Sequence, residues 1–90
     1  MAKSEEDIRQ DIIDITRGTS YNKWQIGITN DPERRLPERG KSPDYAYIAR
    51  ANTIGVARRI EKDFLDKGMQ GGPGGGTPDS TYTYLFRKKR

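Results

Sequence analysis

Apolar residues are scarce in this chain, and they occur in short periodic segments separated by polar ones. They account for 31% of the 90 residues, while 33% of the residues are charged. So little apolar material can build one small core, because dividing it between two cores would leave neither able to offset the entropy of chain ordering. We therefore expect residues 1–90 to form a single small domain of modest stability.

Helical spacing of apolar residues predicts two amphipathic helices. The first covers residues 5–17, and Ser4 before it is a residue type that caps helix N-termini. The second carries apolar residues at the same spacing, begins after Asn52 or Thr53 and ends at Gly68, which suits the position after a helix C-terminus.

Strands are predicted where apolar and polar residues alternate, which occurs at residues 23–29, 45–50 and 81–86. A short helix over residues 32–36 lies between the first two strands, and Pro37 is expected to end it. The glycine-rich segment 69–80 is predicted to be a flexible loop. The predicted fold class is therefore α+β, with a three-stranded sheet flanked by helices and the chain order α-β-α-β-α-β.

Composition excludes several kinds of chemistry. The chain has no Cys and no His, which excludes disulfides, typical zinc sites, cysteine nucleophiles and imidazole acid–base catalysis. Residues 1–16 carry two basic and five acidic side chains, which leaves residues 17–90 with a net charge of +7. Two explanations of this imbalance are open: the basic part of the chain binds an anionic partner, or its charge only keeps the protein in solution. No apolar run is long enough to span a membrane, so we expect a cytoplasmic protein with no membrane partner.

One carboxylate falls on the apolar side of a predicted helix. Glu61 lies at helical spacing between the apolar residues Ala57, Ile60 and Phe64, where a charged group loses hydration. An ion pair with an arginine of the helix over residues 32–36 is one explanation. A catalytic or metal-binding role, with a hard cation such as Mg²⁺ or Mn²⁺, is the other.

Three short motifs together resemble the GIY-YIG nuclease family. Gln25-Ile26-Gly27 stands where the family has its Tyr-Ile-Gly tripeptide, and the interval from Gly27 to Arg35 matches the interval to the family's arginine. The segment from Ala57 to Glu61 matches the helix that carries the family's metal-binding glutamate. The resemblance covers roughly residues 24–68 and implies a mainly antiparallel sheet.

The chain also departs from the family pattern. The family's first strand, which bears Gly-Ile-Tyr and forms a hairpin with the second strand, has no counterpart in residues 1–20, and Gln25 replaces one family tyrosine. The aromatic segment Tyr82–Phe86 at the other end of the chain could take the place of that strand. The domain would then be circularly permuted.

The resemblance implies metal-dependent hydrolysis of nucleic-acid phosphodiesters, with DNA as the expected substrate. Glu61 would hold one Mg²⁺ or Mn²⁺, and Arg35 would stabilise negative charge on the phosphate. A tyrosine hydroxyl would orient or deprotonate the attacking water, with Tyr84 or Tyr82 as first candidates and Tyr47 next. The ordinary pKa of tyrosine, near 10, would then have to be lowered.

Contacts to nucleic-acid phosphates are expected from basic side chains spread along the chain, namely Lys23, Arg34, Arg39, Lys41, Arg50, Arg58, Arg87, Lys88, Lys89 and Arg90. A protein partner could supply sequence specificity. The alternative function is a catalytically inactive GIY-YIG-like module that binds nucleic acid or another protein, which the missing tripeptide favours.

Overall fold

The computed structural model describes residues 2–38, 46–71 and 80–87. Its elements in chain order are α1 (Glu5–Thr16), the short 3-10 helix η1 (Tyr21–Lys23), β1 (Trp24–Thr29), α2 (Pro32–Glu38), β2 (Tyr47–Arg50), α3 (Ile54–Asp66), β3 (Gln70–Gly71) and β4 (Tyr82–Arg87). The predicted α+β class is confirmed. Within the described ranges, no helix is long and apolar enough to cross a membrane.

The four strands form one mixed sheet in the order β2-β4-β1-β3. β4 pairs antiparallel with the whole of β1, from Trp24 opposite Arg87 to Thr29 opposite Tyr82. The other side of β4 pairs antiparallel with β2, whereas β3 runs parallel to β1. The last strand of the chain therefore joins β1 and β2 into one sheet.

The predicted number of strands was wrong by one, and the predicted chain order lacks η1 and β3. β3 lies inside segment 69–80, which was predicted to be a flexible loop, and Met69 just before it is buried in the core. Gln70 and Gly71 show no alternation of polarity. They become a strand because the edge of β1 offers unpaired backbone groups. Residues 72–79 of the predicted loop lie outside the described residues.

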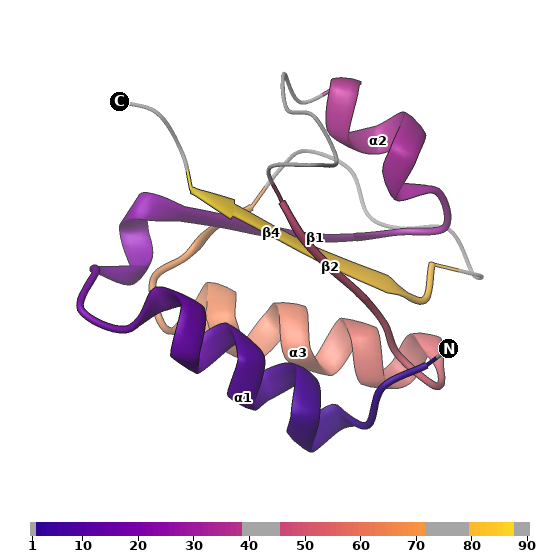
Figure 1. Ribbon diagram of the computed structural model, residues 1–90, viewed down its shortest axis with the longest axis horizontal. Helices are drawn as coiled ribbons and strands as arrows, with labels where there is room; N and C mark the ends of the chain where they lie inside the picture. Colours follow the sequence, from indigo (N-terminus) through magenta and orange to yellow (C-terminus); the bar gives the residue numbers. More distant parts are fainter. Residues whose placement is uncertain (1, 39–45, 72–79, 88–90) are drawn as a thin grey trace.

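Helices cover both faces of the sheet (Figure 1). On one face, the apolar sides of α1 and α3 form a single cluster with strand residues that include Ile26 and Leu85. On the other face, Leu36 of α2 forms a second cluster with Tyr84 and Phe86. Successive residues of β4 thus point alternately toward α3 and toward α2.

The helix ends follow local signals. The Ser4 hydroxyl accepts a hydrogen bond from the backbone N–H of Asp7 at 3.1 Å, and the Thr53 hydroxyl accepts one from the N–H of Val56 at 3.2 Å. Gly68 follows α3 with a φ of +118°, a conformation that favours glycine. These contacts explain why the bounds of α1 and α3 were predicted within a residue or two.

Pro37 does not end the short helix, contrary to the prediction. α2 runs from Pro32 to Glu38, with Pro37 in its last turn. A proline there removes one intrahelical hydrogen bond. The helix is held by its other contacts, because Leu36 is fully buried and the Asp31 side chain accepts a hydrogen bond from the N–H of Arg34 at 3.3 Å.

Candidate functional site

Glu61 lies on α3 beside the apolar side of the helix and is half-buried. Burial raises the pKa of its carboxyl group, and the positive charge of Arg58 offsets only part of that rise. Among the described residues, no side chain forms a hydrogen bond or an ion pair with Glu61. The carboxylate is therefore partly desolvated and available to a cation.

The sheet separates Glu61 from the short helix α2. α2 packs on the face opposite α3, and the side chain of Arg34 is exposed there. The expected ion pair between Glu61 and an arginine of this helix is therefore not formed by Arg34. The side chain of Arg35 lies outside the described part of the structure.

Tyr84 is 2% exposed and points toward α2. Its ring stacks on Phe86 with 6.1 Å between ring centres, and the end of the ring lies over Gly27 on the neighbouring strand. A Cβ atom at Gly27 would lie 2.5 Å from Cζ of Tyr84. Gly27 is therefore required by the close approach of the tyrosine, and Tyr82 lies two residues away on the same face of β4.

Tyr47 points to the other face of the sheet, where its hydroxyl donates a hydrogen bond to Oδ2 of Asp11 at 2.6 Å. Lys3 contacts the same oxygen at 2.5 Å. Burial and the Asp11 carboxylate raise the pKa of Tyr47. This direction is opposite to the one required of a tyrosine that deprotonates water.

The predicted catalytic residues are thus divided by the sheet. Tyr82 and Tyr84 lie on the α2 face, and α2 carries Arg35. Tyr47 and Glu61 belong to the α1–α3 side. Sequence patterns could not reveal this division, because it follows from the register between β2, β4 and β1.

No group of three or more metal-ligating side chains is found in the part of the chain that the structure describes. Glu61 could supply one carboxylate ligand, and water and a substrate phosphate would have to supply the others. Mg²⁺ is commonly bound by one or two carboxylates together with phosphate oxygens. Glu61 by itself would therefore suit only a hard cation that binds together with its substrate.

The predicted phosphate-contacting residues share one property. Those within the described residues are exposed, and none forms an ion pair there, although Arg58 is near enough to Glu61 to act on its pKa: Lys23, Arg34, Arg50, Arg58 and Arg87. The basic residues that do form ion pairs in the described ranges are all outside the predicted set: Lys3, Arg9, Arg17, Arg59 and Lys62. Arg39, Lys41, Lys88, Lys89 and Arg90 lie outside the described residues.

An ion-pair network between α1 and α3 was not foreseen from the sequence. Glu5 binds Arg59 and Arg9, each at 2.7 Å, and Arg9 also binds Asp63 at 2.7 Å. The spacing of Glu5 and Arg9 suits an ion pair within one helix and was a usable signal for part of the network. The contacts to α3 depend on tertiary packing.

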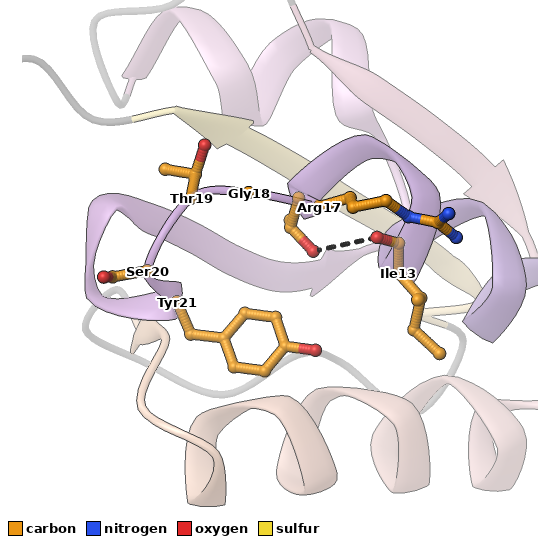
Figure 2. A pocket seen from close by; sticks show the side chains of 7 residues that line it. Ile13, Arg17, Gly18, Thr19, Ser20 and Tyr21 are labelled. Atoms are coloured by element: carbon orange, nitrogen blue, oxygen red, sulfur yellow. Dashed lines mark hydrogen bonds between the residues drawn. The ribbon is translucent and has the colours of Figure 1, made fainter.

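An open cavity of about 340 Å³ lies where α1 meets η1 (Figure 2). It is lined by residues 16–21 together with Ile13. At the end of α1, the Thr16 hydroxyl donates a hydrogen bond to the carbonyl oxygen of Ile13 at 3.4 Å. None of the predicted site residues lines this cavity, so it is separate from the candidate site.

Comparisons of this chain with protein-family models, with curated proteins and with solved structures found no match.

Proposed function

We propose that this chain binds nucleic acid through contacts to its phosphates. The observation that carries the proposal is the division of the basic side chains of the described residues into two groups. Those predicted to contact phosphate are exposed and form no ion pair, whereas those outside that set, with the exception of Lys67, are neutralised by ion pairs. An exposed cation without a partner can displace counterions from a phosphate at little cost.

Two adjacent arginines on α3 provide a matched test. Arg58 is exposed and forms no ion pair among the described residues, whereas Arg59 contacts Glu5 at 2.7 Å. Arg58→Gln is expected to weaken binding of a labelled DNA and to lower the slope of log K against log salt by about 1. Arg59→Gln is expected to leave the salt slope unchanged. Equal effects of the two substitutions would contradict the proposal.

A module that binds another protein instead of nucleic acid would behave differently in the same titration. The native protein would then show no salt-dependent affinity for DNA or RNA. Such a result would remove the nucleic-acid proposal altogether.

Metal-dependent phosphodiester hydrolysis by a divergent, circularly permuted relative of the GIY-YIG nucleases is the second candidate function. The partly buried carboxylate of Glu61, without a partner among the described residues, favours it. The antiparallel pairing of β4 with β1 supports the permuted arrangement, because the family's missing strand should form a hairpin with this one. A bound Mg²⁺ or Mn²⁺ would polarise the phosphate. Arg35 and a tyrosine on the α2 face would be the remaining candidates.

Cation binding and cleavage can be tested separately. Mn²⁺ is expected to raise the thermal unfolding temperature of the native protein and not that of Glu61→Gln. Asp66→Asn is the control, because Asp66 is exposed on the same helix and contacts Lys62 at 3.3 Å. An equal Mn²⁺ response in all three proteins would contradict a metal site at Glu61.

Nicking of supercoiled plasmid in Mg²⁺ or Mn²⁺ is the direct test of hydrolysis. The second candidate expects nicking by the native protein and its loss in folded Glu61→Gln and Arg35→Ala variants. Binding of DNA without nicking would instead support a catalytically inactive module that binds nucleic acid. The raised pKa of Tyr47 and the separation of Glu61 from Tyr84 by the sheet favour that outcome.

A further inference from the structure

Arg50 and Tyr82 form a pair on the sheet face that α2 covers. They are directly opposite each other in the register of β2 and β4, and the guanidinium carbon of Arg50 lies 5.9 Å from the ring centre of Tyr82. Residues opposite each other across two strands point to the same face. The guanidinium thus lies over the aromatic ring at the surface of the sheet.

Tyr82 is the one member of an aromatic row that α2 leaves accessible. Tyr82, Tyr84 and Phe86 alternate along β4 and share a face. Tyr84 and Phe86 are buried in the cluster around Leu36, whereas Tyr82 is outside this cluster and only half-buried. The protein therefore presents a tyrosine ring at the end of a central strand, where solvent and ligands can reach it.

Arg50 is exposed, and no acidic side chain pairs with it among the described residues. Its aromatic neighbour holds the guanidinium in place without neutralising its charge. Arg9 and Arg59, by contrast, are both held by carboxylates. The pair thus combines a planar cation and an aromatic ring, two groups on which nucleic-acid bases stack.

We propose that Arg50 and Tyr82 form a stacking site for an unpaired base, and that the preferred ligand of this chain is single-stranded nucleic acid. The inference rests on the proposed nucleic-acid binding. Bases in a duplex are stacked on each other, so their faces are not available to a side chain on a sheet surface. An unpaired base can lie on the ring or on the guanidinium while its phosphate contacts the charge.

The competing explanation is that the pair only stabilises the sheet, as cross-strand pairs do. A structural pair would change the thermal unfolding temperature when it is altered. It would not make binding depend on the presence of bases in the ligand.

The test is fluorescence anisotropy with the full chain and three labelled ligands: an oligothymidine, the same oligomer with abasic sites, and its duplex with oligoadenine. The native protein is expected to bind the oligothymidine about tenfold more tightly than either of the other two. Tyr82→Leu is expected to lose this preference, whereas Tyr82→Phe retains it because the ring remains. Arg50→Lys is expected to retain part of the affinity without the planar group.

A folded Tyr82→Leu variant that keeps the preference for oligothymidine would overturn the inference, as would equal binding of the three ligands by the native protein. The abasic comparison uses the native protein, so the inference stays testable even where a variant fails to fold. Absence of salt-dependent binding to all three ligands would instead contradict the proposed function itself.

Discussion

Only glycine fits at position 27, because the ring of Tyr84 occupies the space in which a Cβ atom would lie. The two residues are opposite each other in the pairing of β1 with β4. The tyrosine covers the glycine backbone and so fills the gap that the missing side chain leaves in the sheet. A position that reads as a weak point in a strand is therefore closely packed.

Gly27→Ala is expected to destabilise the protein by about 1–3 kcal/mol, because the added methyl group displaces a buried ring. Urea unfolding followed by the fluorescence of Trp24, the single tryptophan, measures this loss. Gly55→Ala is the control, since the nearest atom to its added Cβ would be 3.7 Å away. An equal effect of the two substitutions would contradict the packing argument.

Thr83 is fully buried on β4, and its hydroxyl has no hydrogen-bond partner among the described residues. Thr83→Val replaces the hydroxyl with a methyl group of similar size, so it is expected to raise the free energy of unfolding by about 1 kcal/mol. Thr16 provides the contrast, because its buried hydroxyl donates to the carbonyl oxygen of Ile12 at 2.7 Å. Thr16→Val should give no such gain in urea unfolding.

At the level of elements, ion pairs connect α1 to α3 across their outer sides. Glu5 accepts hydrogen bonds from both Arg59 and Arg9, and Arg9 also contacts Asp63. Exposed ion pairs contribute little individually, but these share partners and link two helices that cover the same face of the sheet. The Arg59 and Arg9 guanidinium groups lower the pKa of Glu5 from its ordinary 4.5 to about 2.

This shift predicts a specific loss of stability in acid. The folded state binds the proton of Glu5 more weakly than the unfolded state, so the contribution is present above pH 4.5 and is lost as the pH falls toward about 2. Glu5→Gln is expected to flatten the fall of the unfolding temperature in this range. Glu6→Gln in the same helical turn, which is exposed, should behave like the native protein. Identical pH profiles for Glu5→Gln and the native protein would exclude this role of Glu5.

At the level of the whole molecule, the C-terminal strand is central to the architecture. β4 lies between β1 and β2, and its residues contribute to both apolar clusters, with Leu85 in one and Tyr84 and Phe86 in the other. Without it, β1 and β2 have no partner in common, and both faces of the sheet lose buried area. Folding therefore depends on long-range contacts between β4 and strands that lie much earlier in the chain.

A chain that ends at Thr81 is accordingly expected to lack a cooperative unfolding transition. The loss should be visible as the absence of near-UV circular dichroism from packed aromatic rings and as a broad response of Trp24 fluorescence to urea. A sharp transition in the shortened protein would show that β1, β2 and the helices form a core without β4.

Local interactions determined what could be read from the sequence alone. Helix ends are signalled by the caps Ser4 and Thr53 and by the terminating Gly68. The helices and the three longer strands are signalled by the periodicity of apolar residues. All these signals act within about four positions of the chain. Periodicity likewise predicted that Glu61 lies beside an apolar helix face. These features need no knowledge of where the rest of the chain lies.

Only the tertiary structure decided which residues meet. Tyr47 reaches Asp11 from 36 positions away, β3 forms because an edge of β1 is free, and strand register places Tyr82 next to Arg50 and Tyr84 over Gly27. Register and choice of face are set by long-range pairing of strands, for which a short sequence motif carries no signal. The candidate residues could therefore be named from the sequence, whereas their division between the two faces of the sheet could not.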